Sequence, residues 1–135
     1  SSDRERIGDL AKNIAKRTLI LQQEQRMPRA LMGLRHMGQL AALQLKDVLD
    51  AYAQRDLERA KGVWNRDAEI DALEDSVFRE LLTFMMEDPR NISPCTHLLF
   101  CSKNVERVGD HTTNIAETVH YIVTGASLPV ERPKG

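Results

Sequence analysis

Two pairs of carboxylates stand four residues apart in the sequence, a spacing that could hold a metal ion. One pair is Asp67 and Asp71, and the other is Glu106 and Asp110. On a helix, residues four apart lie one above the other on the same face. Four carboxylates on two neighbouring helices would form a hard-oxygen site suited to iron, manganese, magnesium or calcium. The spacing therefore predicts a surface cation site, and it is equally consistent with a charged face exposed to water.

One of these carboxylate pairs belongs to a segment that occurs twice in the chain. The letters ERIGDLAKNIAKR span residues 5–17, ERVGDHTTNIAET span residues 106–118, and seven of the thirteen positions are identical. Agreement of this kind indicates an internal repeat. Glu5 and Asp9 occupy the acidic positions of the first copy, so they are also candidate metal ligands.

A glycine lies inside each copy of the repeat, at Gly8 and Gly109. Glycine costs about 1 kcal/mol relative to alanine in a helix interior, so two occurrences at one motif position need a reason. A helical glycine usually marks a place where another group approaches the backbone closely. We therefore predict a close approach at both glycines.

The segment Glu117-x-x-His120 matches one half of the motif used by ferritin-like di-iron sites. Those sites need two such motifs and two further glutamates that face the bundle interior. The sequence contains no second motif of this kind, no HExxH and no phosphate-binding glycine loop. These observations predict an interaction module that is not an enzyme. The alternative is a carboxylate-bridged metal-binding helical protein with a storage or redox role.

The composition is typical of a soluble helical protein. Of the 135 residues, 41% are hydrophobic and only 4% are aromatic, which favours helices over strands built from aromatic and β-branched residues. Nineteen basic and twenty acidic side chains give a net charge of −1, which argues against nucleic acid as a partner. Cys95 and Cys101 cannot bridge each other within one helix, and reduced thiols are consistent with a cytoplasmic protein.

Four helices are expected from the periodicity of the apolar residues and from residues that begin or end helices. Their predicted spans are 3–26, 28–55, 56–88 and 93–125. Pro28 can open the second helix, and Asp56 is a plausible N-cap for the third. Ser93 followed by Pro94 predicts the start of the fourth helix, and Gly125 predicts its C-terminal cap.

The last predicted helix carries a seam of residues at alternating spacings of three and four, which is typical of bundle packing. The seam consists of Leu98, Cys101, Val105, Val108, Thr112, Ile115, Val119 and Ile122. At about 100° per residue, Glu106 and Asp110 fall away from this seam and are expected to point towards the surface. Long helices joined by short connections fold back antiparallel, so the last three helices should form an up-down-up bundle. The expected fold class is all-α.

The repeated segment, together with LLTFMMEDPRNI at residues 81–92, closely resembles proteins of the PhoU family. The resemblance implies two sequence-related three-helix repeats whose Glu/Asp-x-x-x-Asp motifs hold iron clusters or other metal ions in some members. It implies that residues 1–27 are the last helix of a first repeat and that residues 28–126 are a complete second repeat. Residues 127–135 would then form a flexible tail, and the chain would be the C-terminal part of a longer protein.

The same resemblance implies a regulatory function. The protein would be an accessory of the phosphate-specific ABC transporter and a negative regulator of phosphate-starvation signalling. Its expected partners are the transporter ATPase and the sensor histidine kinase, and it would be cytoplasmic, reaching the membrane only through these partners. The expected cofactor is a divalent or ferric metal ion, namely iron, manganese or magnesium, with no organic cofactor.

The first predicted helix is expected to lack the other two helices of its repeat, so Glu5 and Asp9 should find no carboxylate partners in this chain. Its apolar stripe consists of Ile7, Leu10, Ile14 and Leu21. Burying four such side chains is worth on the order of 6–10 kcal/mol before entropy costs. The stripe should therefore pack either on the other three helices of its own chain or on a second chain. We expect the second outcome, by exchange of this helix between two copies or by pairing of two such helices, which gives a homodimer or another homo-oligomer.

Overall fold

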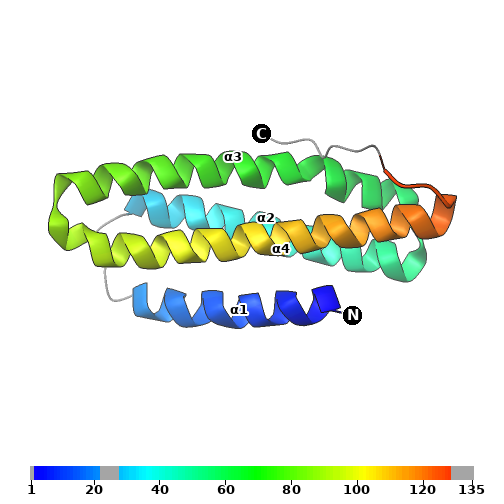
Figure 1. The fold of residues 1–135 in the computed structure, drawn as a ribbon, viewed down its shortest axis with the longest axis horizontal. Coiled ribbons are helices and arrows are strands. Elements are labelled where there is room, and N and C mark those ends of the chain that lie inside the picture. The colour runs from blue at the N-terminus through cyan, green and yellow to red at the C-terminus, as the bar shows by residue number, and fades with distance from the viewer. Residues whose placement is uncertain (1, 22–27, 129–135) are drawn as a thin grey trace.

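The described part of the chain contains four long helices and one short 3-10 turn. Figure 1 shows how the four helices lie alongside one another. The computed structural model describes residues 2–21 and 28–128. The helices are α1 (Ser2–Leu21), α2 (Pro28–Gln54), α3 (Leu57–Glu87) and α4 (Ile92–Thr124), and the turn η1 (Pro89–Asn91) precedes α4. No strand occurs in these two ranges, so the predicted all-α class is confirmed. None of the described helices combines the length and the apolar character needed to cross a membrane.

Two of the predicted helix caps are confirmed. Asp56 precedes α3 with an extended backbone, and its Oδ1 accepts a hydrogen bond from the Arg59 N–H at 3.1 Å. Gly125 ends α4 in the left-handed region, with φ 74°, and its N–H donates to the Tyr121 carbonyl at 2.7 Å. Both ends are therefore fixed by contacts within a few residues of the chain.

The start of α4 differs from the prediction. Ser93 is not its N-cap, because the helix already begins at Ile92. The reason lies in η1, where the Asp88 side chain accepts a hydrogen bond from the Arg90 N–H at 2.9 Å. This capped turn leads directly into α4, so Pro94 falls inside the first helical turn, where proline is tolerated.

The helix α4 is central, because it packs against each of the other three helices. The helices α2, α3 and α4 run up, down and up, as predicted, and α1 lies along α4 in the antiparallel direction (Figure 1). The core between them is aliphatic, and its fully buried members include Met37, Val48, Ile70, Leu81, Leu98 and Val119. Most of the predicted seam of α4 therefore faces this core.

One residue of the predicted seam lies outside the core. Ile122 is 45% exposed. Asp67 of α3 faces Gly109 of α4, so α3, which begins at Leu57, starts opposite a point near Val119. Ile122 therefore lies beyond the first residue of α3, so that helix does not cover it.

The helix α1 covers its apolar stripe on its own chain. Ile7 is 5% exposed, and Leu10 and Ile14 pack against the core. Close by, Oδ1 of Asp3 lies 2.6 Å from Nδ1 of His111 on α4. Within one chain the stripe of α1 therefore packs against α4, and the expected pairing with a second copy stays a prediction.

Some predictions fall on residues that the structure does not describe. Residues 22–26 of the first predicted helix and the side chain of Leu21 lie outside the described part of the chain. So do residues 129–135 of the predicted tail. Leu128, which we assigned to the same tail, is partly buried and packs against the core.

Candidate metal centre

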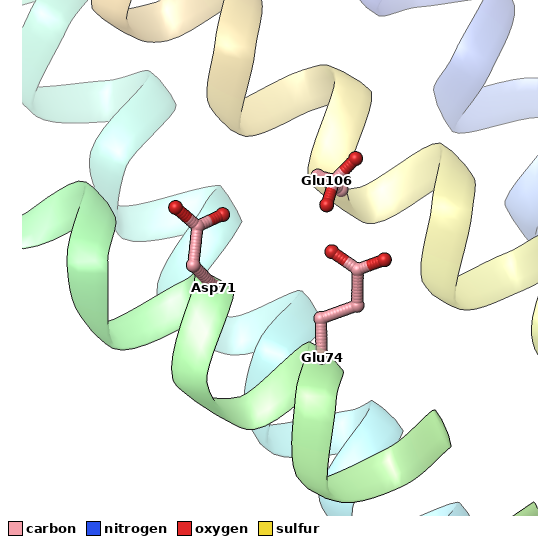
Figure 2. A group of neighbouring side chains, drawn as sticks. All are labelled: Asp71, Glu74 and Glu106. Carbon is pink, nitrogen blue, oxygen red and sulfur yellow. The ribbon is translucent and has the colours of Figure 1, made fainter. Parts of the chain in front are cut away.

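Three carboxylates meet on the seam between α3 and α4 (Figure 2). Glu106 of α4 faces Asp71 and Glu74 of α3, and one oxygen of each lies within 4.8 Å of the other two. Two oxygens on opposite sides of a calcium ion, each about 2.4 Å from it, are about 4.8 Å apart. Oxygen atoms within this limit of one another can be ligands of one cation. The donor set is therefore consistent with a hard cation.

Antiparallel packing of α3 on α4 brings these carboxylates together. Asp71 and Glu74 share one face of α3, because residues three apart are neighbours on a helix surface. The helix α4 runs past them in the opposite direction and places Glu106 beside both. The structure thus brings together two of the four residues that the sequence assigned to this site, Asp71 and Glu106.

Asp67 lies deeper than we predicted. We expected it on the flank of its helix, but it is only 2% exposed. Its Oδ1 lies 3.0 Å from the point that a Cβ on Gly109 would occupy. The glycine lets a buried carboxylate reach the α4 backbone, so the predicted close approach at Gly109 is confirmed. Asp67 is not one of the three residues whose oxygens converge.

The remaining acidic candidates lie elsewhere. Asp110 is half-buried and lines a surface hollow between α1 and α4, together with Asp9 from the first copy of the repeat. Glu5 and Asp9 are exposed on α1. The predicted close approach at Gly8 is wrong for this chain, because no described atom lies within 4 Å of its Cβ position. The two copies of the repeat therefore have different surroundings.

Two residues of the centre, Glu74 and Lys103, were not predicted. Glu74 follows Asp71 by three residues, so its place on the same helix face could have been found from the sequence. Lys103 precedes Glu106 by three residues on α4. Its Nζ lies 3.0 Å from Oε1 of Glu106 and 3.7 Å from Oε1 of Glu74. A positive charge from the chain itself therefore contacts two of the three carboxylates.

The Glu117-x-x-His120 segment takes part in structural contacts. Trp64 of α3 donates its Nε1–H to Oε1 of Glu117 at 3.3 Å. Nδ1 of His120 lies 2.7 Å from the carbonyl of Ala126, just beyond the end of α4. One residue of the segment thus contributes to the packing of α3 on α4, and the other holds the chain that leaves α4.

Comparison with known proteins gives one family. The family model described as PhoU domain matches residues 34–119. The chain is 59% identical over 135 residues to the phosphate-specific transport system accessory protein PhoU homolog of Rhizobium meliloti, covering 99% of this chain and 56% of that protein. A relative of the same description from Caulobacter vibrioides is 56% identical over 130 residues, which is 96% of this chain and 56% of that protein.

Two crystal structures have the same fold. PhoU from Pseudomonas aeruginosa matches with a TM-score of 0.85 and 40% identity, over 92% of this chain and 59% of that one. The phosphate transport system regulatory protein PhoU from Streptococcus pneumoniae matches with a TM-score of 0.80 and 30% identity, over 96% and 60%. The chain spans about half the length of the curated relatives it matches. Sequence, family model and fold agree, and the chain belongs to the PhoU family.

Proposed function

We propose that this chain contributes to a regulatory adaptor that controls phosphate uptake and phosphate-starvation signalling. The observation that carries this proposal is its 59% identity to a protein named as an accessory of the phosphate-specific transport system. The adaptor works in the cytoplasm as a negative regulator. It acts on the ATPase of the phosphate ABC transporter and on the sensor histidine kinase, and its role is regulatory rather than catalytic.

A chimera tests this proposal. In the gene for the Rhizobium meliloti relative, the matching segment is replaced by residues 1–135 of this chain, and the host's own copy is deleted. We expect phosphatase expression in phosphate-rich medium to match that of a strain that carries the intact relative, and to be low in both. The deletion strain without the chimera is the negative control. High phosphatase expression in cells that accumulate the chimera at a normal level would contradict the proposal.

We also propose that Asp71, Glu74 and Glu106 bind a divalent or ferric cation. Support comes from the convergence of three carboxylate oxygens within 4.8 Å on two packed helices. Oxygen donors of this kind are suited to iron, manganese, magnesium or calcium. Relative to the set proposed from the sequence, Glu74 joins the ligands, whereas Asp67 and Asp110 lie outside the three converging carboxylates.

The internal repeat supplies a matched control for the cation site. In the variant Asp71→Asn plus Glu106→Gln, two of the three ligands lose their charge, and we expect Mn²⁺ affinity to fall at least tenfold in isothermal titration calorimetry. In the variant Glu5→Gln plus Asp9→Asn, the first copy of the motif loses the same charge on exposed positions, and we expect binding close to that of the wild type. If the first variant binds Mn²⁺ as well as the wild type, the site has been misplaced.

A further inference from the structure

Lys103 lies where a cation would have to contact the carboxylates of the centre. Its ammonium nitrogen is 3.0 Å from Oε1 of Glu106 and 3.7 Å from Oε1 of Glu74. Both residues belong to the three carboxylates drawn in Figure 2. We propose that Lys103 is an internal competitor for this centre. Its ammonium group neutralises the carboxylates when no metal ion is bound, and it has to leave when one binds. This inference rests on the cation site proposed above.

The Lys103 ammonium group and a bound metal ion would compete for the same carboxylate oxygens. A carboxylate oxygen that binds a metal ion lies about 2.0–2.6 Å from it. The ammonium group of Lys103 already contacts an oxygen of Glu106 and lies close to Glu74. An ion held by the same carboxylates would therefore lie only a few ångströms from a second positive charge. Because the centre is half-buried, water screens this repulsion less than it would at a fully exposed site.

Exposure indicates which partner moves. The side chain of Lys103 is 56% exposed, whereas those of Glu74 and Glu106 are 17% and 24% exposed. A lysine side chain is long and flexible, so Lys103 can rotate into solvent without disturbing the core. The carboxylates are the fixed part of the centre, and the lysine is the part that can leave.

The lysine also links the centre to a neighbouring hollow. Glu74 and Lys103 line a surface hollow between α3 and α4 together with Phe78, Leu99 and Phe100. When the ammonium group leaves the carboxylates, the charge at the rim of this hollow changes. Cation binding would thus change the charge of the adjoining surface as well as that of the ligands.

Mn²⁺ titration of three lysine variants tests the inference. We expect Lys103→Met to bind Mn²⁺ about tenfold more tightly than the wild type, because one nearby positive charge is removed. Lys103→Arg keeps the charge and should bind like the wild type. Lys46→Met removes one charge from α2, where the side chain is 74% exposed and paired with Asp50, and it should also bind like the wild type.

A second measurement follows the lysine itself. After reductive methylation with a ¹³C label, the NMR signal of the Lys103 amine should shift when Mg²⁺ is added, whereas that of Lys46 should not. Wild-type binding that does not tighten in Lys103→Met would overturn the competition and leave the cation site standing. Binding by Lys103→Met alone would support the competition, and no binding by either protein would remove both the cation site and its competitor.

Discussion

Asp67 is buried beside the backbone of α4, although a carboxylate is costly to move away from water. The contact exists because Gly109 has no side chain and leaves room for Oδ1 of Asp67. At the matching position of the first copy, Gly8 is exposed and no described atom is close. Gly109 therefore allows a close contact between α3 and α4, whereas Gly8 has no such contact in the described structure.

Replacing these glycines by alanine should have opposite effects on stability. Gly8→Ala gains helix propensity in open space, and we expect it to stabilise the protein by up to about 1 kcal/mol. Gly109→Ala gains the same propensity but pushes a buried carboxylate aside, and overpacking of this kind costs about 1–3 kcal/mol. We expect a net loss of about 1 kcal/mol for Gly109→Ala. Urea unfolding followed by circular dichroism measures both, and stability changes of the same sign would contradict the reasoning.

Burial raises the pKa of the Cys95 thiol, because the thiolate would lose its hydration in the core. The folded protein keeps this proton at pH values where the unfolded chain loses it, above about 8.5. The contribution to stability is therefore fully present below that pH and is lost as the pH rises further. We expect the thiol to react slowly with DTNB at pH 7.5 in the native protein and quickly in urea. Fast reaction of Cys95 in the native state would contradict its burial.

At the scale of the helices, α1 depends on a single neighbour. In the described part of the chain it contacts only α4 among the helices. Ile7 is the most buried apolar side chain of this contact, and Asp3 adds its contact with His111. A helix with so few contacts is expected to open more readily than α2, α3 and α4.

Truncating Ile7 should loosen α1 selectively. Removal of a buried isoleucine side chain costs about 2–5 kcal/mol, which is a large part of what can hold α1 on α4. In Ile7→Ala we expect faster amide hydrogen exchange throughout α1 and little change in the other helices. Lys12→Ala, at an exposed position of α1, is the control. Equal amide exchange rates in α1 of the wild type and of Ile7→Ala would show that the Ile7 contact does not hold α1 on α4.

Local signals were enough to predict some parts of this structure and not others. The caps at Asp56 and Gly125 follow from nearby residues, so the sequence could predict them. The start of α4 depends on hydrogen bonds of the Asp88 side chain in the preceding turn, which periodicity does not reveal. The apolar stripe of α1 predicts that a face is covered, but it does not say which surface covers it.

Only part of the candidate centre could likewise be predicted from the sequence. Antiparallel neighbours and a spacing of four were enough to pair Asp71 with Glu106. The burial of Asp67 depends on how α3 is rotated about its own axis, and that rotation is set by packing across the whole bundle. Lys103 is not a metal ligand, so the ligand pattern did not predict it, although its spacing of three from Glu106 is itself a sequence signal.

At the scale of the whole molecule, the internal repeat is used in two different ways. On α4, Gly109, Thr112 and Ala116 are buried in the bundle. The matching positions 8, 11 and 15 on α1 are exposed. The face that α4 packs against the bundle is thus exposed at the equivalent positions of α1. The two-repeat organisation implied by the resemblance to the PhoU family stays a prediction, in which the other helices of the first repeat would cover this open face.

Self-association through α1 also stays a prediction, and the structure now suggests how it could occur. Within one chain, α1 packs on α4 through Ile7 and its neighbours. The same contact made between two copies would bury the same side chains, so exchange of α1 would cost little in contacts. The intramolecular form needs no second molecule, and the exchanged form is therefore favoured only at high protein concentration.

Sedimentation velocity can decide between the two forms. At high micromolar concentration we expect a dimer of twice the chain mass of 15.3 kDa, dissociating on dilution. Ile7→Ala should reduce the dimer fraction, because it weakens the contact that the two copies would exchange. Lys12→Ala should leave the fraction unchanged, since that side chain is exposed on the opposite face. A single species of 15.3 kDa at high micromolar concentration would rule out the exchange and leave α1 on its own chain.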